Sequence, residues 1–468
     1  MIGACLSLLL VVVSSQRHDA VVAECGPHRI TLSEYRLAYQ EVVRNPGVFD
    51  SPAVREEFLD EMIAGRLLAA EAKRRGRGVD ESMKASMDAY RDRRLRRAHF
   101  DALIKPAVRV EERDVEEAYR FTQEQRRLSH LFFPDIRSAD SVSTFLAKGA
   151  TFEALATRVF ADSALGRSGG DLGWVSWDQL EYDLAMTAFR LEVGDVSPPV
   201  ASSFGYHILK VTDFKKNPLI TRQQYEDRRR KVRYLLESKI GEKEALAYVR
   251  SMLSRATIRL NPEVLDFVRE KLQDIFSRIP SPADQFSEVQ LQDEEIRLVE
   301  MTLWDARQEI MAVVNGSPLT VEWFMGAIQY IPYAIVHTSF RATFDYAIRD
   351  FLLTKEAVAK GLDRQEDVVL ATALFEEYQI QRGFRRDLIR SVTVTEEDLR
   401  ASYDRNTSAW HEVPFDSVRG FIQDAVTVEK KQAVVPSLVK ELSGETPITK
   451  HMSIINRYYD DLLKAAPR

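Results

Sequence analysis

The stretch that decides the fold lies between residues 129 and 213 and contains four ordered blocks. They read SHLFF (129–133), FADSALGRSGGDLGW (160–174), AFRLEVGDVSPPV (188–200) and FGYHILKVTD (204–213). The first and last blocks are short apolar runs typical of strands, and each contains one histidine. We therefore expect His130 and His207 to lie in two strands of one small domain, where they can form a pair.

The segments between these strands indicate the class of the domain. Apolar residues at helical spacing predict a helix over 141–160, and the glycines of 166–173 predict a loop that can approach a site closely. This loop lacks the Lys–Ser/Thr ending of a phosphate-binding P-loop. A short amphipathic helix follows, and then residues 196–200 form an edge strand because they contain two prolines. The order predicts an α+β domain with an antiparallel sheet.

The four blocks closely resemble a parvulin-type (PpiC/SurA-like) peptidyl-prolyl cis/trans isomerase, the rotamase module of extracytoplasmic folding factors. The resemblance covers residues 126–214. It implies that His130 and His207 lie together beneath the active site and that Asp162 faces the prolyl bond. It also implies an apolar proline pocket.

The pocket residues implied by the resemblance are Leu172, Leu180 and Leu184, with Phe189 as a further substrate-binding candidate in the same amphipathic segment. Leu184 departs from the family, which usually has phenylalanine there, and leucine lacks the flat face on which a proline ring packs. The basic cluster of phosphate-directed parvulins is also missing at 134–137, so selectivity for phosphorylated substrates is not expected.

Rotation about an X–Pro bond breaks no covalent bond, so the reaction needs no nucleophile, metal or cofactor. An apolar pocket that favours the twisted amide, with Asp162 near the carbonyl or nitrogen, is sufficient. Two structural alternatives remain open. In the first, the two histidines have a purely structural role as the hydrogen-bonded floor of the site. In the second, Asp162 is the cap of a helix or turn.

Length and composition limit the remaining possibilities. A chain of 468 residues exceeds what one core supports, and 45% hydrophobic and 29% charged residues are typical of a globular protein. The net charge of −6 does not favour nucleic acid or an anionic membrane as partner. Only Cys5 and Cys25 are present, too few for a disulfide framework or a zinc site.

The chain begins with an apolar run at residues 2–15 that is too short for an ordinary membrane span. We interpret residues 1–19 as a signal peptide or an N-terminal anchor. Residues 20–125 are predicted as a helical lobe, with one helix over 31–43 and a second that starts at Ser51-Pro52 and stops at Gly76.

A long helix at 221–253 and a strand at 256–260 follow the isomerase domain, and we expect residues 219–277 to complete the first lobe. Residues 278–300 form a linker. The rest, 301–468, repeats the lobe without an isomerase insert. Three pairs of segments carry the repeat: MAVVNGSPLTVEWF (311–324) with VVAECGPHRITLSEY (21–35), EAVAKG (356–361) with EAKRRG (71–76), and VTEEDLRASY (394–403) with VEERDVEEAY (110–119).

The predicted fold is therefore multidomain: a parvulin-like α+β domain inserted in mainly helical, SurA-like chaperone lobes, with the lobe duplicated. Two functions fit. One is an isomerase and folding chaperone for newly exported polypeptides that contain X–Pro bonds. The other is a holdase or assembly factor whose parvulin domain only binds peptide. Both place the protein in the periplasm or elsewhere outside the cytoplasm, with a possible membrane tether through residues 2–15.

Several large side chains of the lobes are either client contacts or core. They are Met83, Met87, Tyr90, Trp323, Phe324, Met325, Tyr330 and Tyr333.

Overall fold

The computed structural model describes residues 19–43, 48–160, 164–216, 222–277, 290–406 and 413–465. The chain forms two compact units: residues 1–95 with 360–468, which we call unit 1, and residues 96–359, which we call unit 2. No helix among the described residues is long and apolar enough to cross a bilayer. The predicted signal or anchor segment at 2–15 lies outside the described residues.

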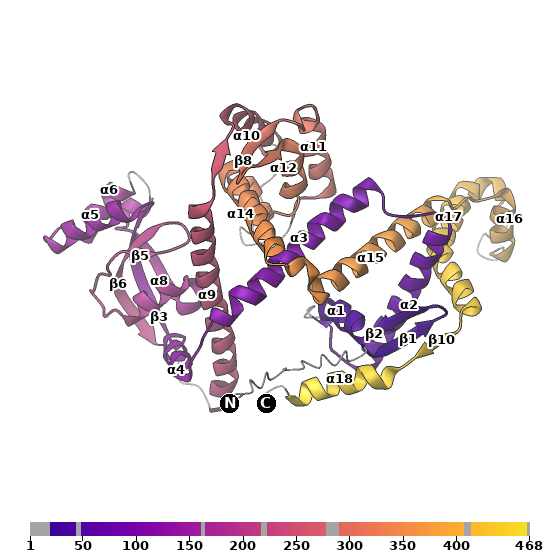
Figure 1. The fold of residues 1–468 in the computed structure, drawn as a ribbon, viewed down its shortest axis with the longest axis horizontal. Helices are drawn as coiled ribbons and strands as arrows, with labels where there is room; N and C mark the ends of the chain where they lie inside the picture. The colour runs from indigo at the N-terminus through magenta and orange to yellow at the C-terminus, as the bar shows by residue number, and fades with distance from the viewer. Residues whose placement is uncertain are drawn as a thin grey trace, which may run out of the picture. The chain divides into compact units, whose positions relative to one another are not determined.

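The small α+β domain lies in unit 2 and is built on a four-stranded antiparallel sheet in the order β4-β3-β6-β5 (Figure 1). Its strands are β3 (Glu124–Phe133), β4 (Asp171–Ser176), β5 (Val200–Ala201) and β6 (Tyr206–Lys216). Its helices are α5 (Ile136–Ala147), α6 (Phe152–Val159), α7 (Ala164–Arg167) and α8 (Tyr182–Arg190). The predicted α+β class with an antiparallel sheet is confirmed for this domain.

Helices cover both faces of this sheet. On one face Leu131, Phe133 and Ile208 pack against α6 through Phe152 and Leu155. On the other face Leu128, Leu209 and Val211 form one core with Leu184 and Phe189 of α8. That second core also includes Val115 and Ala118 of α4 (Glu112–Phe121) and Val232 and Leu236 of α9 (Arg222–Arg255), so the domain shares apolar packing with the helices beside it in the chain.

Two local predictions for this domain are corrected. The single helix expected over 141–160 is two helices, because Gly149 adopts φ +92° and Thr151 then caps α6 by accepting a hydrogen bond from the Ala154 N–H. The glycine-rich loop ends earlier than expected, since β4 already begins at Asp171.

Unit 1 combines a small sheet with long helices. Strands β1 (Val21–Cys25), β2 (His28–Thr31) and β10 (Ile448–Lys450) form a sheet in the order β10-β1-β2. The helices are α1 (Leu32–Val43), α2 (Pro52–Arg74), the N-terminal part of α3 (Glu81–Leu103), α15 (Glu366–Arg390), α16 (Glu396–Arg405), α17 (Phe415–Glu445) and α18 (Met452–Ala465). The predicted limits of α2 are confirmed, because Ser51 Oγ accepts from the Val54 N–H and Gly76 has φ +76°.

The helical part of unit 2 has a related sheet, in the order β7-β8-β9, formed by β7 (Ile258–Leu260), β8 (Ile310–Val314) and β9 (Ser317–Thr320). Its helices, besides α4 and α9, are α10 (Pro262–Phe276), α11 (Asp293–Leu303), α12 (Val321–Ile328), α13 (Tyr333–Thr338) and α14 (Phe340–Ala359). Phe324, Met325 and Tyr333, which the sequence left open between client contact and core, are buried here.

The same order of elements occurs twice along the chain: hairpin, helices, a short helix with an acidic first turn, a long helix, a short strand and a final helix. The short strand near the end of each series, however, pairs with the hairpin of the other series. β10 pairs with β1, and β7 pairs with β8. Of residues 219–277, the strand β7 therefore joins the second hairpin, whereas α9 packs against α4 of the first copy. Two similar sheet edges can each accept a three-residue strand, and the sequence does not determine which edge receives it.

Candidate isomerase site

The two histidines predicted to pair do so. His130 lies on β3 and His207 on the adjacent β6, where His207 is opposite Phe132. Their Nδ1 atoms are 3.2 Å apart. Phe160 stacks on the His130 ring with centroids 5.2 Å apart, and Phe132 lies at the same distance from the His207 ring. The pair is thus enclosed by aromatic side chains on both sides.

Burial keeps both rings neutral. It lowers the pKa of His130 to about 4, and the nearby His207 acts in the same direction. Burial also lowers the pKa of His207, although the Glu181 carboxylate opposes this. Near pH 7 each ring therefore has one proton. Both nitrogens of His207 take part in hydrogen bonds, whereas Nε2 of His130 is buried and has no partner among the described residues.

The hydrogen bonds of Ser202 indicate the tautomers of the two histidines. Its hydroxyl accepts from the backbone N–H groups of Phe204 and Gly205 at 3.1 and 3.2 Å, which occupies both acceptor positions. The hydroxyl proton is then available for His207 Nε2, 3.0 Å away, rather than for the Gly205 carbonyl at 3.3 Å. His207 consequently carries its proton on Nδ1 and donates it to His130 Nδ1. We assign this arrangement from the hydrogen-bond network.

Two glycines permit the backbone to approach the pair. Gly170 has φ +79°, and a Cβ there would lie 2.2 Å from the His130 carbonyl oxygen. The His130 N–H donates to the Gly170 carbonyl at 2.9 Å, which holds the glycine-rich loop against β3. Gly205 has φ +155°, and a Cβ there would lie 2.4 Å from the Phe133 carbonyl oxygen. Any larger residue at either position would displace the strand that carries His130.

The turn at 202–205 is held from outside the sheet. Arg250 of α9 donates through Nη2 to the Ser202 carbonyl. The N–H of Ser203 donates to Glu181 at 2.8 Å, and its hydroxyl donates to the other oxygen of the same carboxylate. A cavity of about 520 Å³ borders this turn and extends along α9 to Arg349 and Leu353 of α14. Residues of the helical part therefore position the turn that holds His207.

The predicted pocket residues are only partly brought together. Leu180, Leu184 and Phe189 belong to one apolar cluster, in which Leu184 and Phe189 are 7% and 2% exposed. Leu172 is 40% exposed on β4 and lies outside that cluster. Asp162 lies outside the described residues.

Sequence reasoning missed Ser202, Glu181 and Arg250. A serine five residues before His207, in a Ser-Ser-Phe-Gly turn, was a usable signal because such turns bond their own backbone. Arg250 had no signal, since its contact spans 48 residues. No cluster of three or more histidine, cysteine or acidic residues with metal-binding geometry occurs in the part of the chain that the structure describes.

Comparison with known proteins identifies the domain. Residues 136–213 match the Rotamase family, described as the PPIC-type PPIASE domain. The chain contains a parvulin-type rotamase domain. The match begins ten residues after the predicted N-terminal limit of 126 and ends one residue before the predicted C-terminal limit of 214.

Two curated relatives extend the likeness beyond the rotamase domain. The foldase protein PrsA of Bacillus subtilis is 31% identical over 164 residues, which are 34% of this chain and 53% of PrsA. The parvulin-like PPIase of Rickettsia prowazekii is 32% identical over 139 residues, which are 29% of this chain and 49% of that protein. The chain thus spans about half the length of each of these two relatives.

Among solved structures, one chain from a study of two SurA-like chaperones of Campylobacter jejuni is 18% identical to this protein, with a TM-score of 0.25. The match covers 52% of this chain and 100% of that chain. PrsA of Bacillus cereus is 21% identical, with a TM-score of 0.23, over 60% of this chain and 95% of that chain.

Proposed function

We propose that this protein is a peptidyl-prolyl cis/trans isomerase and folding chaperone for exported polypeptides. The observation that carries the proposal is the neutral His130–His207 pair, with its Nδ1 atoms 3.2 Å apart, on the sheet of the domain whose residues 136–213 match the rotamase family. The two foldase and isomerase relatives support the same activity.

The catalysed step is rotation about an X–Pro amide, whose barrier is about 18–20 kcal/mol because of amide resonance. We propose that Leu172 and Leu180 provide apolar surface for the proline ring, with the buried Leu184 and Phe189 in the core against which Leu180 packs, and that Asp162 favours the twisted amide electrostatically. The histidine pair and Ser202 hold the floor of the site. No proton is transferred, which agrees with the pKa of both histidines, since burial lowers each from its usual value.

A holdase with a weakly active rotamase domain is the second candidate. Leu184 favours it, because this side chain is only 7% exposed within the core of α8 and lacks the aromatic face that the family uses. The recurrence of the helical elements favours it as well.

We further propose that the helical lobe arose by duplication and that only the first copy carries a rotamase domain. The interval between α4 and α9 contains that domain, whereas the corresponding interval between α16 and α17 is only nine residues, 406–414. Two lobes on one chain increase the surface available to an unfolded client.

The proposed location is outside the cytoplasm, with residues 2–15 as export signal or tether. Fractionation of cells and N-terminal sequencing of the mature protein test this. A full-length N-terminus in the cytoplasmic fraction would contradict it.

A paired assay separates the two candidate functions. The first arm follows cis-to-trans relaxation of an unphosphorylated X–Pro peptide, and the second follows aggregation of an unfolded client. We expect acceleration in the first arm, reduced in Asp162→Ala without loss of helicity. If the wild-type protein suppresses aggregation but leaves relaxation unchanged, the isomerase function is excluded and the holdase function remains.

A further inference from the structure

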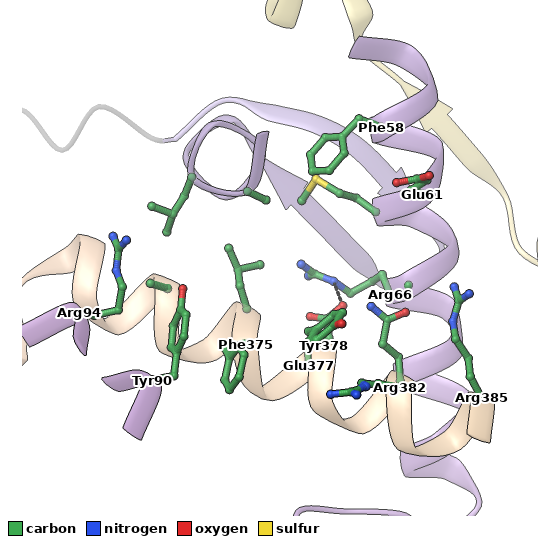
Figure 2. Close-up of a pocket in the computed structure, with 17 residues that line it drawn as sticks. Phe58, Glu61, Arg66, Tyr90, Arg94, Phe375, Glu377, Tyr378, Arg382 and Arg385 are labelled. Carbon is green, nitrogen blue, oxygen red and sulfur yellow. Dashed lines mark ion pairs between the residues drawn. The ribbon is translucent and has the colours of Figure 1, made fainter. Parts of the chain in front are cut away.

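A cavity in unit 1 is lined by none of the residues of the rotamase domain and has no role in the isomerase site. It encloses about 720 Å³ and is lined by residues of α1, α2, α3 and α15 (Figure 2). This volume is typical of ligand sites in proteins. Gly65 lets α2 approach α15 closely beside the cavity. A Cβ at this position would lie only 3.0 Å from the side-chain amide of Gln381.

The middle of the cavity is apolar and aromatic. Phe58 and Met62 of α2 line this part together with Leu374, Phe375 and Tyr378 of α15. Phe375 stacks on Tyr90 of α3, with ring centroids 4.1 Å apart and planes 6° apart, so the two rings form a continuous aromatic part of the wall. Tyr378 is 48% exposed and presents its ring to an incoming group.

The charged residues of the cavity are predominantly basic. Arg66, Arg94, Arg382 and Arg385 line it together with Glu61 and Glu377, an excess of two positive charges (four minus two). Arg66 is already neutralised, since it forms ion pairs with Glu34 and Glu377 at 2.9 and 2.7 Å. Burial raises the pKa of Glu377, and the ion pair with Arg66 opposes this shift.

The other three arginines are available to a ligand. Arg94, Arg382 and Arg385 form no ion pair with any residue in the described ranges, and the Nε of Arg94 is buried without a hydrogen-bond partner there. An unpaired guanidinium beside an apolar surface favours binding of a carboxylate.

The three arginines without an ion pair lie at two ends of the apolar wall, and the Arg66–Glu377 pair lies between them (Figure 2). Figure 2 shows Arg94 near Tyr90 at one end and Arg382 and Arg385 at the other, with Phe375 and Tyr378 between them. From Phe375 to Arg385 the α15 axis advances roughly 15 Å, at about 1.5 Å per residue. An extended peptide covers this length with about four to five residues. A lipid with one headgroup can satisfy only one end.

We propose that this cavity binds an extended segment of unfolded polypeptide in which an aromatic or branched apolar side chain is flanked on both sides by aspartate or glutamate. The proposal rests on the chaperone part of the proposed function, but its site is separate from the rotamase domain and requires no proline in the ligand. The apolar side chain enters beside Phe375 and Tyr378, and the flanking carboxylates contact Arg94 at one end and Arg382 or Arg385 at the other.

The test uses the full chain and two fluorescent, acetylated and amidated ten-residue peptides without proline. Both have a Phe-Leu centre, flanked by aspartates in one and by lysines in the other. By fluorescence anisotropy, the aspartate peptide should bind about tenfold more tightly, with a gap that narrows as salt is raised. Equal affinity of the two peptides would overturn the proposal.

Matched variants locate the site. Arg382→Ala and Tyr378→Ala should each weaken binding of the aspartate peptide by about three- to tenfold. Arg386→Ala, which removes the same charge from an exposed position of α15 outside the cavity, should have no effect. Circular dichroism confirms that each variant is folded. If Arg382→Ala and Arg386→Ala weaken binding equally, the contact is general surface charge and the proposal fails.

Two further arms separate the alternatives. Dodecanoate, an anionic lipid probe, should not displace the aspartate peptide; if only dodecanoate binds and Arg382→Ala abolishes its binding, the cavity is a lipid site and the polypeptide assignment is wrong. The X–Pro relaxation assay should be unchanged in Arg382→Ala. A wild-type protein that binds the peptide without accelerating relaxation refutes the proposed isomerase and leaves this site intact.

Discussion

Ser202 connects the histidine pair to the rest of the domain through a single hydroxyl group. This group is bonded to His207 Nε2 and to two backbone N–H groups, while the Ser202 carbonyl accepts from Arg250 of α9. The residue is 4% exposed, so water cannot readily replace these bonds. The orientation of the pair therefore depends on a residue that contacts no substrate in the proposed mechanism.

Replacement of this hydroxyl tests its positioning role. We expect Ser202→Ala to lower kcat/KM for an X–Pro peptide by about tenfold, equivalent to roughly 1.4 kcal/mol, mainly through kcat. The ring ¹⁵N chemical shifts of His207 should change, and Ser202→Thr should restore both. Ser203→Ala, which loses only a bond to Glu181, should leave the His207 shifts in place; identical spectra for Ser202→Ala and wild type would contradict the tautomer assignment.

The depressed histidine pKa values predict acid sensitivity. Between pH 6.5 and about 4 the unfolded chain binds a proton at His130 that the folded chain does not, so stability falls as pH falls through this window. We expect a loss on the order of 1–2 kcal/mol, after allowance for partial exposure of the ring. Urea unfolding at several pH values measures it. His130→Asn should flatten this dependence, and an unchanged slope would show that other groups cause it.

At the scale of residues, the sequence predicts the features of the site that follow from the local pattern of apolar residues. Two histidines centred in apolar runs sufficed to predict the pair, since strands of one small sheet bring such residues together. Leu172 remained separate from Leu180 and Leu184 because its exposure depends on an irregularity in the register between Leu128 and Ser129, which no apolar pattern encodes.

At the scale of elements, α2 and α5–α6 illustrate success and failure. Ser51-Pro52 and Gly76 mark both ends of α2 with strong chemical signals, and the helix has those limits. The apolar spacing over 141–160 continues through Gly149, so the pattern alone predicted one helix where backbone conformation makes two. Periodicity reports which side chains are buried, and does not exclude a turn between two helices with the same buried face.

The final helix, α18, should be essential for unit 1. Ile455 is fully buried in the core that surrounds β1 and α2. We expect Ile455→Ala to destabilise unit 1 by about 2–5 kcal/mol through the cavity that it leaves. Leu462→Ala, on the same helix at 49% exposure, should cost less than about 0.5 kcal/mol. Hydrogen exchange followed separately for peptides of each unit measures both; equal effects of the two variants would contradict the packing of α18.

At the scale of the whole molecule, the exchange of terminal strands makes the two helical copies interdependent. Each sheet contains a hairpin from one copy and a short strand from the other. The sequence predicted the repeated order of elements but not this pairing, because each short strand can pair antiparallel with the edge of either hairpin.

Paired cysteines test the exchange directly. Glu24 lies opposite Thr449 in the antiparallel pair of β1 and β10, a separation within reach of a disulfide. We expect Glu24→Cys with Thr449→Cys to form a crosslink on mild oxidation, detected by peptide mapping. Glu24→Cys with Arg259→Cys, the pair expected for lobes completed in chain order, should remain unlinked. The reverse result would require that residues 219–277 complete the first lobe.

The proposed function depends most on catalysis of X–Pro rotation by the rotamase domain. Two-dimensional NMR exchange spectroscopy of an unphosphorylated Ala-X-Pro-Phe peptide, with the full chain at a hundredth of the peptide concentration or about that ratio, measures this rotation at equilibrium, without a coupling protease. We predict cis–trans exchange peaks with wild type and markedly weaker peaks with Ser202→Ala. Spectra that match the peptide alone, from a chain with intact helicity, would contradict the account.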